Sequence, residues 1–197
     1  MGDITLPECV PLITLGQCNL FPHGLLPLYI FEARYREMVD YALEHSRILC
    51  VSTRLPDGSE DDDDAVFPYS TAGLIRACVR GDDGTSNLIL QGLQRVRFRD
   101  WVQKEPFRIV NIEPIPSLNP HPERAIDLQQ RLKDAIAKSN IGNAQMLQQL
   151  DETASPEVLV DVVGYHLIPE PYARQPLLEM EDVCDRLDFL LKAFARV

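Results

Sequence analysis

The chain has 197 residues, of which 45% are hydrophobic and 25% are charged, a composition typical of folded proteins that excludes a wholly disordered chain. Its 19 basic and 30 acidic residues leave a formal net charge of −11. An acidic surface repels phosphate backbones and anionic lipid, so nucleic acid is an unfavoured partner and no membrane association is expected. The length corresponds to one large or two small domains.

Cysteine usage and the N-terminal residues indicate a cytoplasmic protein. The five cysteines are an odd number, and no two are at C-x-x-C spacing. A secreted disulfide framework normally has an even, clustered set, so we expect reduced thiols that mostly act as small core residues. No basic residue precedes Arg34, so we expect no signal peptide.

The first half of the chain predicts β-structure with one internal helix. Phe31, Tyr35, Met38 and Ala42 recur at helical spacing and form one apolar face. Short apolar or alternating runs on either side are separated by Pro and Gly turns, including a turn at Leu20–Gly24. We predict a helix at 31–46 and strands at 10–15, 25–30, 47–53, 73–80, 86–91, 94–102 and 107–115.

Two charged segments of this first half could bind ions or partners. Five adjacent carboxylates at Glu60–Asp64 predict a solvated loop; the alternative is Ca²⁺ or Mg²⁺ binding, but the run lacks the spaced ligands of a cation loop. Arg95, Arg97 and Arg99 alternate with apolar residues on one predicted strand. We expect them on an outward face paired with carboxylates, the alternative being an anion site.

A cluster of prolines divides the chain. Pro114, Pro116, Pro120 and Pro122 fall within nine residues, which neither a sheet nor a helix interior accommodates. Beyond them the hydrophobic period changes from two to 3.6. We therefore predict an α+β protein with a β-domain at 1–118 and a helical domain at 119–197. The expected helices are 123–139, 143–150, 156–167 and 176–195.

Motifs of known chemistry are missing from the sequence. It contains no G-x-x-x-x-G-K-[ST] phosphate loop, no G-x-S-x-G and no H-E-x-x-H. The four histidines are scattered, so we predict no catalytic residue, no cofactor and no metal site. Phe21, Trp101 and Phe107 could line an apolar groove; the alternative is that they belong to the core.

Several ordered motifs resemble the Lon protease N-terminal (substrate-binding) domain family. The segment LFPHGLLPLYIFEARYR at 20–36 resembles the family's F-P-G turn, L-P-L strand and I-F-E-x-R-Y helix start. GLIR at 73–76 and QGLQRVRF at 91–98 are similar to two of its strands, and RQPLLE at 174–179 to its last helical region. These matches extend over nearly the whole chain. The resemblance implies a PUA-like β-pseudobarrel followed by a C-terminal helical bundle.

The resemblance also implies a function, which is recognition of unfolded or tagged polypeptide. In Lon proteases an ATPase module and a peptidase follow this domain; the present sequence stops at Val197, so we expect neither activity. The favoured interpretation is a non-enzymatic module that binds unfolded or extended polypeptide, or a protein partner. An RNA-binding PUA-like protein is the alternative, and a small hydrolase with an unrecognised site is a third.

Four residues are the candidate peptide contacts. Phe21 and His23 lie in the predicted turn, and Trp101 and Phe107 lie on the last strands. Loops on a rigid scaffold often carry binding residues, and aromatic rings supply apolar area at low entropic cost. We expect weak binding that depends little on salt. The sequence indicates no oligomeric state.

Overall fold

The computed structural model describes residues 5–58, 65–139 and 155–195. The predicted helix 143–150 and the acidic run Glu60–Asp64 lie outside these residues. The chain divides into two compact units, Met1–Ile115 and Pro116–Val197, which we call the β unit and the helical unit. The division falls inside the run of prolines, a few residues before the predicted position 118.

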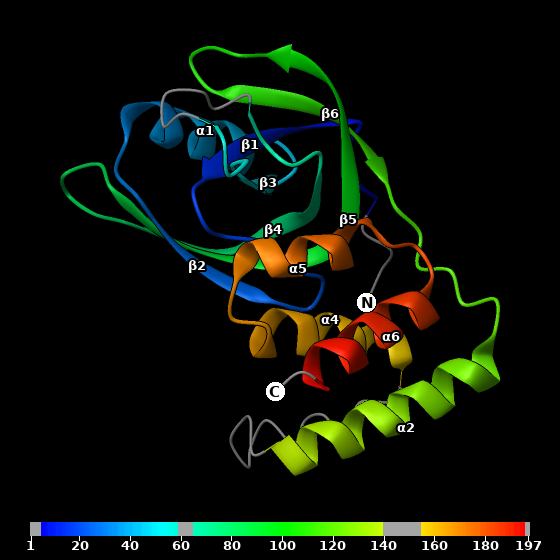
Figure 1. Cartoon of the computed structure of the whole chain (residues 1–197). Coiled ribbons are helices and arrows are strands. Elements are labelled where there is room, and N and C mark those ends of the chain that lie inside the picture. The colour runs from blue at the N-terminus through cyan, green and yellow to red at the C-terminus, as the bar shows by residue number, and fades with distance from the viewer. Residues whose placement is uncertain (1–4, 59–64, 140–154, 196–197) are drawn as a thin grey trace. The chain divides into compact units, whose positions relative to one another are not determined.

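The β unit is a six-stranded mixed sheet that closes on itself (Figure 1). The strand order is β2-β5-β4-β3-β1-β6, and a further pairing of β5 with β6 closes five of the strands into a barrel. β2 pairs with β5 at the outside of this ring. The strands are β1 (Cys9–Leu15), β2 (Leu25–Ile30), β3 (Ile48–Thr53), β4 (Tyr69–Arg80), β5 (Ser86–Gln103) and β6 (Arg108–Pro114).

β1 and β3 are parallel, and the helix α1 (Ala33–Glu44) lies in the chain between them. Its buried side includes Tyr35, Met38 and Ala42, three of the residues that predicted it. These residues join the larger of two hydrophobic clusters found among the described residues of the β unit, together with side chains of β1, β3 and β5. The mixed strand and helix content confirms the predicted α+β class.

One long strand stands where two were predicted. The expected strands 86–91 and 94–102 are joined in β5, whose first part pairs with β2 and whose last part pairs with β6. The register shifts at Leu93, because Gly73 pairs with Gly92 while Ala72 pairs with Gln94. This bulge lets β5 continue into the barrel's closing pair.

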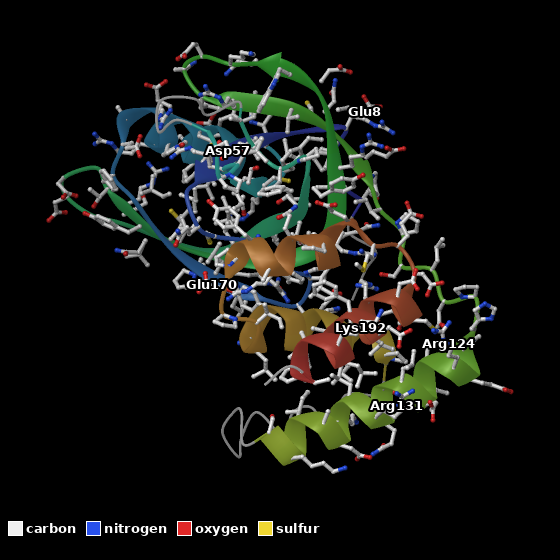
Figure 2. The ribbon with its side chains drawn as sticks, viewed as in Figure 1. Glu8, Asp57, Arg124, Arg131, Glu170 and Lys192 are labelled. Atoms are coloured by element: carbon white, nitrogen blue, oxygen red, sulfur yellow. The ribbon has the colours of Figure 1, made fainter. Side chains whose placement is uncertain are left out.

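The helical unit contains α2 (Pro122–Ser139), α4 (Pro156–Leu167), α5 (Pro171–Glu179) and α6 (Val183–Phe194). α6 packs against α2 and α4, and apolar side chains of each helix face this core. Charged side chains such as Arg131 on α2 and Lys192 on α6 are exposed (Figure 2). Among the described residues, no helix is both long and apolar enough to cross a bilayer.

The prediction of a single final helix at 176–195 is wrong. The chain breaks between α5 and α6, where Leu118 forms a parallel bridge with Asp182. The N–H of Leu118 donates to the carbonyl of Glu181, and the N–H of Val183 donates to the carbonyl of Leu118. Asp182 then begins α6 as its N-cap, accepting a hydrogen bond from the N–H of Cys184 at 2.7 Å.

None of the five cysteines forms a disulfide, and burial divides them into two groups. Cys50 and Cys184 are buried, and the other three are partly exposed. Burial raises the pKa of the Cys50 thiol, and burial followed by the nearby Asp182 raises the pKa of Cys184. A raised pKa means less thiolate at a given pH, and the thiolate is the reactive form.

We therefore expect iodoacetamide at mildly alkaline pH to modify Cys9, Cys18 and Cys78 before Cys50 and Cys184. Peptide mass spectrometry over a time course would measure the order. In urea all five should react at similar rates, because the difference arises from the fold. Equal rates for Cys50 and Cys78 in the native protein would contradict the burial argument.

Candidate functional site

The four predicted contact residues do not form one surface. Phe21 is fully buried and Phe107 is 7% exposed, so both rings belong to the interior, the alternative left open by the sequence. Phe107 lies in the cluster that contains α1, whereas Trp101 packs, partly buried, against the smaller cluster of the barrel. His23 is exposed, in the turn before β2, with φ of 66°.

These placements change which residues can contact a peptide. A side chain buried in the core offers no area to a ligand, so Phe21 and Phe107 are not available as contacts in this structure. Their aromatic character is explained by packing, since the Phe107 ring lies 5.5 Å from that of Tyr41. A role for His23 and Trp101 stays a prediction.

The three arginines predicted on one strand face also differ in their exposure to solvent. Arg97 and Arg99 are exposed, with Arg97 over the ring of Tyr69 and Arg99 in an ion pair with Glu113. Arg95 is only 2% exposed, so its predicted outward position is wrong. Both faces of β5 are covered at this point, because the adjacent Val96 is buried as well.

An exposed apolar surface is found elsewhere, on the outward side of β2, β5 and β4. Cross-strand pairing sets its rows: Pro27, Ile89 and Ala77 form one row, and Tyr29, Asn87 and Val79 form the next. Side chains in one row of a sheet project from the same face. We call the apolar members the outer apolar face: Leu25, Pro27, Tyr29, Ala77, Val79 and Ile89.

Large apolar side chains on this face are open to solvent. Val79 is 65% exposed, Leu25 57% and Tyr29 56%. Phe31 extends the surface beyond the strand: it is 58% exposed, and its ring centroid lies 5.9 Å from that of Tyr29. Exposed apolar residues gathered in one place, unlike scattered ones, indicate a binding surface.

The outer apolar face is hollowed. A depression of about 380 Å³ lies over β2, β5 and β4, and the described residues that line it carry no charge. Two arginines of β4 near it have polar partners: Arg76 donates to the Gln91 side chain at 2.5 Å, and Arg80 pairs with Asp40 at 2.5 Å. The depression therefore suits an uncharged apolar side chain better than an ionic ligand.

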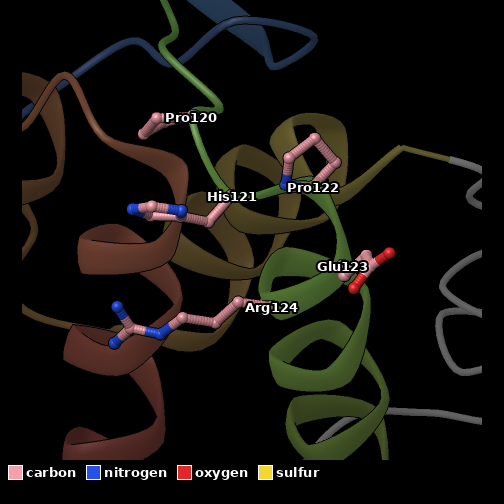
Figure 3. A pocket seen from close by; sticks show the side chains of 5 residues that line it. All are labelled: Pro120, His121, Pro122, Glu123 and Arg124. Carbon is pink, nitrogen blue, oxygen red and sulfur yellow. The ribbon is translucent and has the colours of Figure 1, made fainter.

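Two larger hollows of the molecule have charged side chains in their lining. One of about 630 Å³ is lined by Pro120, His121, Pro122, Glu123 and Arg124 at the start of α2 (Figure 3). Arg124 there pairs with Asp188 of α6 at 2.6 Å. Another, of about 500 Å³, lies between α1 and the β4–β5 turn and is bordered by charged residues of both. Neither offers a continuous apolar lining.

The shifted pKa values of two surface-region groups have local causes. Within the described residues, no three His, Cys, Asp or Glu side chains are placed to hold a metal ion. The lowered pKa of Asp83 comes from its hydrogen bonds with Thr85 in the β4–β5 turn. Burial, followed by Arg174, lowers the pKa of His166. Both effects are explained by local structure.

Relatives of known name match almost the whole chain. The Lon protease of Paraburkholderia phytofirmans is 31% identical over 195 residues and matches 94% of this chain and 24% of its own length. That of Trichlorobacter lovleyi is 26% identical, with 98% of this chain and 24% of its own length matched. The chain thus spans about a quarter of the length of these relatives.

Solved structures of similar fold are N-terminal domains. That of the Mycobacterium avium complex Lon protease superposes with a TM-score of 0.75 at 17% identity, covering 95% of this chain and 98% of its own. A Lon N-terminal domain protein from Xanthomonas campestris gives 0.67 at 22% identity, covering 93% and 97%. The family model for the ATP-dependent protease La (LON) substrate-binding domain matches residues 9–196. The chain therefore belongs to the LON substrate-binding domain family.

Proposed function

We propose that the β unit binds unfolded polypeptide through its outer apolar face. The observation that carries the proposal is the cluster of exposed apolar side chains around an uncharged depression. Membership of a substrate-binding family, whose full-length members are named proteases, supports polypeptide as the ligand. An apolar surface without charged groups would accept many segments and hold each weakly, with dissociation constants from about micromolar to millimolar.

The test is a pair of matched substitutions on exposed strand valines. Val79 lies on the outer apolar face, and Val102, which is 54% exposed, lies near the end of β5. We expect Val79→Asp to weaken binding of a fluorescein-labelled Leu- and Phe-rich peptide by more than about tenfold, because the bound peptide would desolvate the new carboxylate. Val102→Asp should change the affinity less than about twofold. Fluorescence anisotropy gives both constants.

Titrations at two salt concentrations, and with RNA in place of the peptide, distinguish polypeptide binding from RNA binding, the alternative suggested by the PUA-like resemblance. The affinity for the apolar peptide should change little between low and moderate salt. The affinity of a protein for RNA falls steeply as the salt concentration rises, because counterions compete for the phosphates. A short single-stranded RNA that binds more tightly than the peptide would contradict the proposal. Loss of peptide binding in Trp101→Ala but not in Val79→Asp would move the site to the residue predicted from the sequence.

We also propose that this chain binds without catalysing a reaction. The sequence has no nucleotide phosphate loop and no G-x-S-x-G or H-E-x-x-H motif, and Arg124 and Arg80 at its two larger hollows are engaged in ion pairs. Purified protein should release no phosphate from ATP above a buffer blank and leave unfolded casein intact.

A further inference from the structure

The outer edge of the sheet is interrupted by a proline at its centre. β2 is the last strand in the sheet order, and Pro27 is its third residue. An exposed edge strand is the usual place for a peptide to add as a further strand, through a ladder of backbone hydrogen bonds. Whether that mode is open to the β unit depends on where the nitrogen of Pro27 points.

The pairing of β2 with β5 fixes that direction. The N–H of Gly92 donates to the carbonyl of Gly24 at 2.9 Å, just before the pair Leu25–Gln91. In an antiparallel ladder this makes Leu25–Gln91 a non-hydrogen-bonded pair, and Pro27–Ile89, two residues along, is another. The backbone of Pro27 is therefore directed away from β5, toward the outer edge. A donor for an added strand is missing at the middle of β2.

We infer that polypeptide lies across the outer apolar face and is held by side-chain burial, not by pairing with the edge of β2. This inference rests on the function proposed above. Pro27 serves both parts of the arrangement: its ring belongs to the apolar face, and its missing N–H breaks the edge ladder. The occupant is a segment of apolar side chains without charge at its centre, matching the uncharged lining of the depression.

Recognition by side chains has a measurable consequence, which is tolerance of changes in the peptide backbone. The probe is a short labelled peptide of alternating Leu and Ser, compared with the same peptide N-methylated at every residue. N-methylation at every residue removes the donors along both edges of the peptide and leaves its apolar side chains in place. We expect the two dissociation constants for the native protein to agree within about threefold, whereas loss of a strand ladder would cost more than about 30-fold.

The variant Pro27→Val tests the role of the proline itself. Valine keeps an apolar side chain on the face and restores the missing N–H. We expect this variant to bind the unmodified peptide several times more tightly than the N-methylated one. Native protein that already discriminates by more than about 30-fold would overturn face-on binding. A Pro27→Val variant that does not discriminate would overturn the role given to Pro27.

The experiments give a different result if the proposed function itself is wrong. If the outer apolar face is not the site, Val79→Asp will leave the affinity for both peptides unchanged. If it is the site but the edge also takes part, Val79→Asp will weaken binding while N-methylation weakens it further. Circular dichroism of each variant checks that the β unit is folded.

Discussion

Gly92→Ala is expected to unfold the β unit. A Cβ at this position would lie 1.9 Å from the carbonyl oxygen of Phe21 and 2.7 Å from its carbonyl carbon. These are backbone atoms, held by the turn in which His23 donates to the Gly92 carbonyl at 3.0 Å. Relief of the clash must separate β5 from this turn. We expect a loss of more than about 4 kcal/mol, in the range reserved for severe structural conflict.

Gly16→Ala provides the matched control. A Cβ on Gly16 would meet nothing within 4 Å, and this residue is exposed after β1. The substitution should change stability by less than about 1 kcal/mol and in the stabilising direction, because alanine restricts the unfolded chain. Urea denaturation followed by circular dichroism would compare the two. A Gly92→Ala protein as stable as Gly16→Ala would show that the turn can move without cost.

Asp161→Ala is expected to destabilise the helical unit strongly. Arg186 of α6 is fully buried and donates to Asp161 of α4 at 2.9 Å and to the Ser117 hydroxyl at 3.0 Å. Removing the carboxylate leaves a guanidinium in the interior without its counter-ion. Breaking a buried pair in this way costs about 3–5 kcal/mol. The lowered pKa of Arg186, caused by burial and opposed by Asp161, agrees with this dependence.

A double substitution separates the cost of a lone charge from the value of the pair. Asp161→Leu with Arg186→Met replaces both ions by apolar groups, and such exchanges are often neutral or stabilising. We expect it to recover most of the stability lost in Asp161→Ala. The exposed pair of Arg131 and Asp127, at 3.8 Å, is the control: Arg131→Ala should cost less than about 0.5 kcal/mol. Equal losses for Asp161→Ala and Arg131→Ala would contradict the argument.

The elements that could be predicted from sequence are those with a single dominant pattern. The apolar stripe of α1 and the Ser155–Pro156 start of α4 both identified helices. The break before α6 does not follow from the sequence pattern, because the helical spacing of Met180, Cys184 and Leu187 continues across it. Asp182 as an N-cap was the available signal, but the bridge to Leu118 that interrupts the helix is a contact distant in sequence.

The binding surface could not be located for a related reason. In β2 the residues LLPLYI are apolar at both odd and even positions, so alternation does not say which face is exposed. The assignment requires the strand order, which places β2 outside the barrel with Tyr29 exposed and Ile30 buried. Conversely, the turn position of Phe21 predicts an exposed aromatic ring, whereas the structure buries the Phe21 side chain completely.

The way the barrel closes affects how the protein emerges during synthesis. β1 pairs with β6, and Cys9 lies opposite Asn111 in this pairing. The pairing of β1 is therefore complete only after β6, the last strand of the β unit, has been synthesised. At ordinary translation rates the residues between them take about 5–20 s to synthesise. Throughout that interval the five central residues of β1, all buried in the final structure, have no completed barrel to enter. Until β6 has been made, the β1 segment is thus itself an unfolded apolar polypeptide.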